Sequence, residues 1–443
     1  MSLINRLFAR PPLPEVAQRS FHYEQLTELT LPVAFTLLEG GIVGVIAAKI
    51  YQVPPLVLAV ITAAPMFGNL SSLLWSRLAS ARAKVRFASA VQALTVACVL
   101  AIALAPTDHW GAALLVVSMV LSRVLIAGII TVRSVVWSLN YVRAVRARTT
   151  GRLQIITSLV TVLVSSVVGP LLDADPDSFR WVYFSGALFG LVGIAFFSRV
   201  RVIGEKRQRV LERRTRRSTD SGGGGFLRVL REDRRYARYQ TAMFLAGFSN
   251  MIIEAPLVYL VTRTLNASYT ESIAITMVIP FAVSVLTLPM WARYLDRVHV
   301  AEFRARQSVL WVASQLVLWG GALAGSVLWV AMSRLVMGIA RGGGALAWQL
   351  GHNDFAPKDQ LSTYMAIHVT LTGVRGATAP FLGMLLYVGW SGFAWLPEWL
   401  PGFSGIESHL FAVAALISAL SWRGFRRLHR DMQRESRASV NAD

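Results

Sequence analysis

Long apolar runs separated by short polar segments dominate the chain. A helix crosses the roughly 30 Å hydrocarbon core with about 20 apolar residues, and in lipid its backbone must hydrogen-bond to itself. The runs therefore predict twelve transmembrane helices in an all-α membrane protein. Residues 133–152 mix apolar and basic residues and could extend the fourth helix. The predicted spans are 27–50, 54–76, 87–106, 110–132, 153–172, 180–199, 239–262, 272–292, 304–323, 326–347, 361–389 and 408–424.

The same landmarks recur at matched intervals in the two halves of the chain. The first is a Ser-Arg dipeptide that precedes a tryptophan, and the second is a proline thirty-two or thirty-three residues after that tryptophan. The third is a proline that precedes a helix end of the form Trp-x-Arg, and the fourth is a glutamate in the middle of a helix. The first half carries Ser122, Arg123, Trp137, Pro170, Pro65, Trp75, Arg77 and Glu39. The second carries Ser333, Arg334, Trp348, Pro380, Pro280, Trp291, Arg293 and Glu254. Four features in register indicate duplication, and hence two pseudo-symmetric six-helix bundles.

Basic residues gather between alternate helices. With the N-terminus placed inside, 37 of the 44 Lys and Arg residues fall in inside segments, against Lys49, Arg180 and Arg263 outside. The positive-inside rule then predicts cytoplasmic termini. The net charge of +20 is explained by topology, so we expect no nucleic-acid partner. Composition points to a bacterial inner membrane.

The charge pattern also divides the chain into five regions. We predict a cytoplasmic tail at 1–26, an N-terminal bundle at 27–199, a basic linker at 200–238, a C-terminal bundle at 239–424 and a cytoplasmic tail at 425–443. The glycine-rich, arginine-rich linker is predicted to be flexible and to lie near anionic headgroups.

A six-plus-six duplication with a long central cytoplasmic loop resembles the major facilitator superfamily over essentially the whole chain. The Gly-x-x-x-Asp-Arg stretch of that family is partly present: the eighth helix ends in Asp296 and Arg297, whereas the second has Ser76 before Arg77. The resemblance implies a monomeric carrier whose bundles rock around a midplane site. It makes Asp296, Arg297 and Arg77 gate candidates. Arg341, beside three glycines, is either a gate or a side chain that reaches the interface.

Two predicted helices each carry a glutamate near the middle. A charged side chain in mid-membrane costs about 2.5 to 3.5 kcal/mol, so it usually faces a partner or a watery cavity. Glu39 and Glu254 are therefore predicted to carry protons for coupling. Alternatively each is paired with an arginine or hydrogen-bonded near Gly40 and Asn250, and Asn250 is also a candidate for substrate binding.

Besides Arg341, three arginines lie inside predicted helices. Arg123, Arg334 and Arg375, with His368 near Arg375, are candidates to bind an anionic or zwitterionic solute, because a guanidinium fork suits carboxylate and phosphate. Equally, Arg123 could pair with Glu39 and Arg334 with Glu254.

The sequence argues against several other functions. The single cysteine, Cys98, excludes a disulfide framework, and His352, Asn353, Asp354 and His368 form no recognised metal motif. No phosphate-binding loop or catalytic motif is present, so we expect no metal, no cofactor and no enzymatic activity. We predict a proton-coupled secondary transporter. The alternatives are a proton-independent uniporter or organic-anion exchanger, and, in another class, a polytopic membrane enzyme or a non-transporting sensor. The substrate is not encoded visibly.

Overall fold

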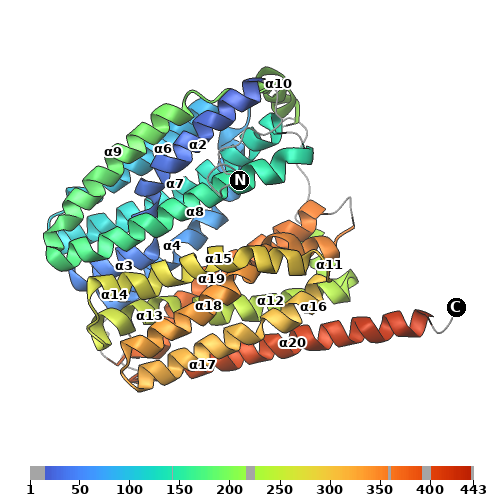
Figure 1. Cartoon of the computed structure of the whole chain (residues 1–443). Helices are drawn as coiled ribbons and strands as arrows, with labels where there is room; N and C mark the ends of the chain where they lie inside the picture. The colour runs from blue at the N-terminus through green and yellow to red at the C-terminus, as the bar shows by residue number, and fades with distance from the viewer. Residues whose placement is uncertain (1–14, 142, 216–224, 358–360, 392–400, 441–443) are drawn as a thin grey trace. The chain divides into compact units, whose positions relative to one another are not determined.

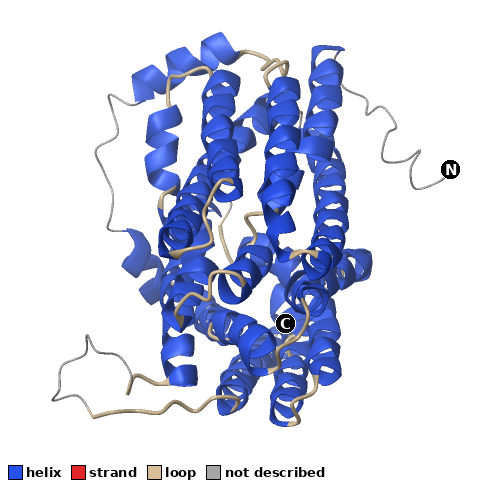
Figure 2. Cartoon of the chain, turned by 90° about the vertical axis from the view of Figure 1, so that its left-hand side faces the viewer, coloured by secondary structure: helices blue, strands red, loops and turns tan. Residues whose placement is uncertain are grey.

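The computed structural model describes residues 15–141, 143–215, 225–357, 361–391 and 401–440. Within these ranges every regular element is a helix, and no β-strand occurs (Figure 2). The predicted all-α class is thereby confirmed.

The chain divides into two compact units. Unit 1 comprises residues 1–52 and 67–221, and unit 2 comprises residues 53–66 and 222–443. The division falls inside α4 (Pro55–Leu70), whose first part belongs to unit 2. The predicted boundaries of the two bundles stay predictions.

In unit 1 the packing is between long helices. Helix α2 packs against α8 and α9, and α6 packs against α7 and α9, as can be followed in Figure 1. The helices of this unit are α2 (Glu15–Thr36), α3 (Gly40–Lys49), α5 (Ser72–Ala79), α6 (Lys84–Ala103), α7 (His109–Asn140), α8 (Arg143–Ala174), η1 (Pro176–Ser178), α9 (Phe179–Phe197) and α10 (Glu205–Thr215).

Unit 2 repeats this pattern of long packed helices. Helix α18 packs against α15 and α17, and α20 packs against α12 and α17. The elements are α11 (Gly225–Glu232), α12 (Arg234–Met251), α13 (Glu254–Tyr259), η2 (Leu260–Thr264), α14 (Tyr269–Ile273), η3 (Ala274–Val278), α15 (Ile279–Leu295), α16 (Val300–Gln307), α17 (Val309–Leu323), α18 (Val327–Leu350), η4 (Gly351–Asp354), α19 (Leu361–Val388) and α20 (His409–Val440).

Eight helical stretches in the described residues are long and apolar enough to cross a membrane. Each of the twelve predicted segments coincides with helical structure, but the count of twelve spans stays a prediction. Several predicted spans are broken in the structure: α2 and α3 form the first, and α12 and α13 form the seventh.

The helices extend beyond the predicted spans where charged residues form ion pairs with neighbouring helices. Helix α2 begins at Glu15 rather than at residue 27, α7 continues to Asn140, and α20 continues to Val440. Hydropathy alone ends a span at the first cluster of charges. Tertiary ion pairs allow the helix to continue through them.

The segment predicted as a flexible linker contains ordered helix that is attached to unit 1. Helix α10 supplies Glu205, which accepts a hydrogen bond from the backbone N–H of Lys84 at 2.7 Å, and Glu212, which accepts one from the backbone N–H of Ala81 at 2.7 Å. The Lys84 ammonium pairs with Glu212 at 2.7 Å. These acids satisfy donors at the start of α6, where a helix leaves its first N–H groups unpaired.

Candidate functional site

The first predicted glutamate lies at a break in a helix. Helix α2 ends at Thr36 and α3 begins at Gly40, with Glu39 in extended conformation at the N-cap of α3. Arg123 of α7 reaches both carboxylate oxygens, from Nη2 at 2.9 Å and from Nη1 at 3.1 Å, and also donates to the carbonyl of Leu38. Of the two alternatives for Arg123, the structure therefore shows the pair with Glu39.

This pair is strong in geometry but not sealed from solvent. The side chain of Arg123 is 8% exposed, whereas that of Glu39 is 35% exposed. A fork of two parallel hydrogen bonds is the strongest arrangement available to a guanidinium and a carboxylate.

The second glutamate occupies the related position in unit 2. Helix α12 ends at Met251, and Glu254 begins α13. Arg334, buried on α18, interacts electrostatically with Glu254. Asn250 is half-buried at the end of α12. Both halves thus place an acid at a break in their first helix and a buried arginine on their fourth.

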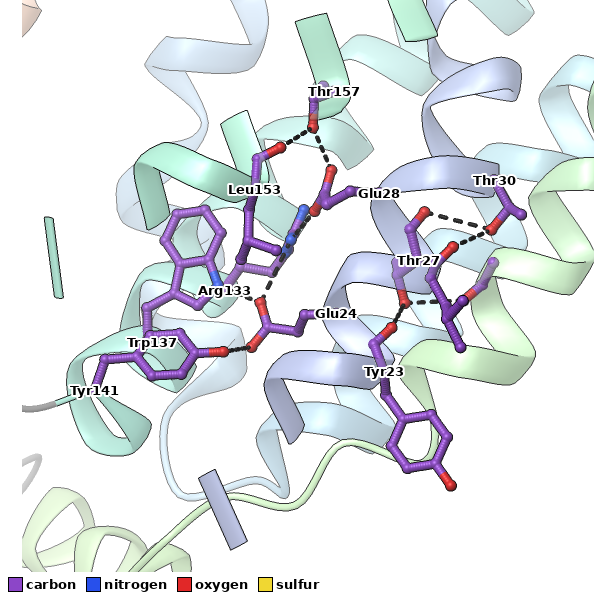
Figure 3. A network of polar contacts seen from close by, with 12 residues as sticks. Tyr23, Glu24, Thr27, Glu28, Thr30, Arg133, Trp137, Tyr141, Leu153 and Thr157 are labelled. Atoms are coloured by element: carbon purple, nitrogen blue, oxygen red, sulfur yellow. Dashed lines mark hydrogen bonds and ion pairs between the residues drawn. The ribbon is translucent and has the colours of Figure 1, made fainter. Parts of the chain in front are cut away.

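A second charged network, on the helix that precedes Glu39, was not predicted from the sequence. Glu24 and Glu28 project from α2 towards Arg133 of α7 (Figure 3). Glu24 is fully buried and Glu28 is 4% exposed. Arg133 forms an ion pair with Glu28 and a longer one, of 3.6 Å, with Glu24.

Each carboxylate in this network has further donors. Trp137 Nε1 and the hydroxyl of Tyr141 donate to Glu24, the latter at 2.8 Å. The hydroxyl of Thr157 on α8 contacts Glu28 and lies 3.1 Å from the carbonyl of Leu153. Figure 3 shows these side chains converging from α2, α7 and α8.

The network holds more acid than base. Two carboxylates face one guanidinium, so the three groups carry a net charge of −1 when all are ionised. Buried charge is costly unless it is paired. One proton bound to either carboxylate would remove that excess.

The residue spacing contained a signal for this network. Glu24 and Glu28 are four residues apart, as are Arg133, Trp137 and Tyr141, and side chains at this spacing share one face of a helix. Glu24 lies in the predicted tail, and Arg133 follows the predicted fourth span in a segment that could extend it, because both lie outside the apolar runs.

Unit 2 contains a cluster of the opposite charge. Arg304 of α16 and Arg375 of α19 are each 4% exposed. His368, also buried on α19, lies with Nδ1 3.2 Å from the side-chain oxygen of Gln240, and its ring is 5.2 Å from that of Trp348. Arg375 and His368 therefore do lie in one region, and Arg304 joins them unpredicted.

The predicted gate residues lie elsewhere. Asp296 and Arg297 are exposed at the end of α15, and Arg77 is exposed on α5. Among the described residues no ion pair of 4.0 Å or less involves these three side chains. Arg341 lies over the ring of Phe281, 4.1 Å from its centroid.

The described residues contain no group of three or more His, Cys, Asp or Glu side chains able to hold a metal ion. His352 is buried in η4, and Asp354 accepts a hydrogen bond from the backbone of Val300 at 2.8 Å. The side chain of Asn353 lies outside the described part of the chain.

Comparison with known families identifies the class of protein. The family model described as Major Facilitator Superfamily matches residues 29–305. The chain belongs to this superfamily. It is therefore an integral membrane transporter rather than an enzyme.

Solved structures share its fold. A mutant form of the nucleoside transporter NupG has a TM-score of 0.68 at 10% identity, with 93% of this chain and 99% of that chain covered. A D-xylose-proton symporter has a TM-score of 0.66 at 13% identity, with coverage of 92% and 96%. The POT family transporter PepTSo has a TM-score of 0.68 at 10% identity, with coverage of 94% and 98%. Comparison with curated proteins finds no match.

Proposed function

We propose that this transporter is proton-coupled and moves a small anionic or zwitterionic solute by alternating access. The observation that carries the coupling is the excess of carboxylate over guanidinium in the buried network of Glu24, Glu28 and Arg133. Buried acids that cannot all be neutralised by a base favour the binding of one proton.

Hydrogen-bond accounting favours Glu28 as the seat of that proton. The Thr157 hydroxyl has one hydrogen to donate. Its oxygen nevertheless lies within hydrogen-bond distance of two acceptors, the Glu28 carboxylate and the carbonyl of Leu153. With a proton on Glu28, the carboxylic acid donates to the Thr157 oxygen and Thr157 donates to Leu153. Glu24 then stays ionised, held by Trp137, Tyr141 and Arg133.

Release of the proton changes how three helices are held together. An ionised Glu28 competes with Glu24 for Arg133. Thr157 then donates its hydroxyl hydrogen to Glu28 and can no longer donate it to the carbonyl of Leu153. Because these residues belong to α2, α7 and α8, protonation alters the contacts among three helices of unit 1.

Glu39 and Glu254 remain further candidates for proton coupling. A proton on either acid would compete with its arginine, so opening of the pair with Arg123 or Arg334 would accompany proton uptake. An arginine released in this way could bind an acidic group of the solute. Asn250 and His368 remain further candidates for substrate binding.

Several expectations from the sequence complete the proposal. The protein works as a monomer in a bacterial inner membrane with both termini cytoplasmic. Asp296, Arg297, Arg77 and Arg341 act at gates.

The test begins by finding a substrate, because no assay can be run without one. A thermal-shift screen of purified protein against metabolite classes identifies compounds that bind the native state, which raise the melting temperature. Proteoliposomes are then used to measure accumulation driven by a pH gradient and, separately, counterflow without a gradient.

We expect Glu28→Gln to abolish gradient-driven accumulation and to spare counterflow. Glu15→Gln is the matched control, since Glu15 lies on the same helix but is exposed. Glu24→Gln, Glu39→Gln and Glu254→Gln in the same assay show which carboxylate couples. Unchanged accumulation in all four carboxylate variants would refute proton coupling and favour a uniporter or an organic-anion exchanger.

A further inference from the structure

Two arginines of unit 2 are buried without an acidic partner in the described structure. Arg304 and Arg375 are inaccessible except for a few per cent of their surface, and no described Asp or Glu lies within 4.0 Å of either guanidinium. A buried charge that lacks an opposite charge is strongly unfavourable. A bound anion would therefore stabilise this pair of cations.

The hydrogen bonds of both guanidinium groups go only to neutral acceptors. Arg375 donates to the backbone carbonyl of Met243 and to Thr372 Oγ1 at 3.2 Å. Arg304 donates to Gln307 Oε1 at 3.3 Å, to the carbonyl of Gly344 at 3.2 Å and to the hydroxyl oxygen of Tyr239. In the described structure the Nε group of each arginine has no hydrogen-bond partner. Donors therefore remain available on both side chains.

The two cations share one region of the unit. Arg304 and Arg375 repel each other electrostatically, and both interact with Tyr239 and His368. Arg375 also lies so close to Gly247 that a methyl group there would fall 2.0 Å from its central carbon. Its position is thus set by surrounding backbone, and like charges are held together rather than allowed to separate.

We propose that Arg304 and Arg375 form a binding site for a carboxylate or phosphate group. Guanidinium forks match both groups in geometry and charge, and one bound anion would offset the mutual repulsion. The assignment of this group to the transported solute rests on the proposed function. The same chemistry could be supplied by an anionic lipid headgroup, and the experiment separates these sources.

The full-length protein is placed in nanodiscs made only of phosphatidylcholine, and its melting temperature is measured at increasing inorganic phosphate and, separately, succinate. We expect at least one of these anions to raise the melting temperature with a saturable dependence. Arg375→Gln and Arg304→Gln are expected to weaken that binding at least about tenfold, since a charge-assisted hydrogen bond is worth about 1.5 to 3 kcal/mol. Arg375→Lys, which keeps the charge but loses the fork, should fall between.

Arg427→Gln is the matched control, because Arg427 is exposed on α20 of the same unit, and it should bind as the unchanged protein does. In nanodiscs containing phosphatidylglycerol, a stabilisation that depends on Arg304 and Arg375 and removes the response to soluble anions would identify the lipid headgroup as the source. It would still support the site.

The site is refuted if neither soluble anions nor phosphatidylglycerol stabilise the protein, or if all variants respond equally. If a glutamine variant does not fold, two measurements still decide the question. They are calorimetric anion binding to the unchanged protein and the response of the Arg375→Lys variant. If the unchanged protein binds no anion but still accumulates solute in response to a pH gradient, only this inference is overturned. If it binds anions through Arg304 and Arg375 but accumulation is unchanged in all four carboxylate variants, only the proposed coupling is overturned.

Discussion

The two halves of the chain differ in charge at related positions. Glu24 and Tyr239 are 215 residues apart, as are Glu39 and Glu254, while Arg133 and Gly344 are 211 apart, as are Arg123 and Arg334. In unit 1 these positions hold an acid and its arginine. In unit 2 they hold a tyrosine and a glycine whose carbonyl accepts a hydrogen bond from Arg304.

The difference teaches that duplication preserved the backbone and the paired charges at the helix breaks, whereas the charges nearer the helix ends diverged. In unit 1 opposite charges neutralise one another and leave one excess carboxylate. In unit 2 charges of one sign gather without a described partner. Replacement of an arginine should therefore have opposite effects on stability in the two units.

The largest effect is expected in unit 1. Arg133→Gln leaves Glu24 and Glu28 buried without their cation, which should lower the free energy of unfolding by about 3 to 5 kcal/mol. Denaturant titration in detergent micelles measures this change. The double variant Arg133→Gln with Glu28→Gln should recover part of the loss, and a double variant no more stable than the single one would contradict the network.

The opposite sign is expected for the counterpart in unit 2. Arg375→Met removes a buried cation without stranding an acid, so in the absence of added anions it should raise the free energy of unfolding by about 2 kcal/mol. The same titration measures it. A loss as large as that for Arg133→Gln would show that Arg375 has an acidic partner and would remove the contrast between the units.

A carboxylate outside the membrane spans gives a reference for the buried acids. Burial raises the pKa of Glu212, but hydrogen bonds from Lys84 and from the backbone of Ala81 outweigh it, so the pKa is lowered overall. A lowered pKa stabilises the fold above the unfolded value and loses this contribution as the pH falls through the folded value. Glu212→Gln should cost about 1 kcal/mol near neutral pH.

Melting temperatures of the Glu212→Gln variant and the unchanged protein, measured across a range of pH, test this expectation. The two curves should converge on acidification. Curves that stay parallel would show that the charge of Glu212 does not carry the stabilisation.

The smallest effect is expected at the helix break of unit 1. Because Glu39 is partly exposed, solvent screens its pair with Arg123, and Glu39→Gln should lower the free energy of unfolding by less than about 1 kcal/mol. Comparison with Glu24→Gln in one titration checks this order. A larger loss at Glu39 than at Glu24 would reverse the ranking of exposed and buried acids.

The internal repeat made part of the candidate site predictable. Glu39, Glu254, Arg123 and Arg334 lie inside apolar runs, where a charge is conspicuous, and their matched intervals linked each acid to one arginine. Glu24 and Arg133 lie just beyond those runs, and Glu28 and Arg304 lie at the very start of predicted spans. There hydropathy cannot distinguish a buried charge from a residue of a cytoplasmic loop.

By itself the sequence determined the helical class, the approximate spans and the twofold repeat, because lipid forces every spanning backbone to bond to itself and makes long apolar runs unambiguous. Only the tertiary structure decided how far each helix continues and which charges meet. Those outcomes depend on side chains brought together from helices more than a hundred residues apart, as with Glu24 and Arg133. The free energy of such a pair depends on its surroundings, which no local pattern records.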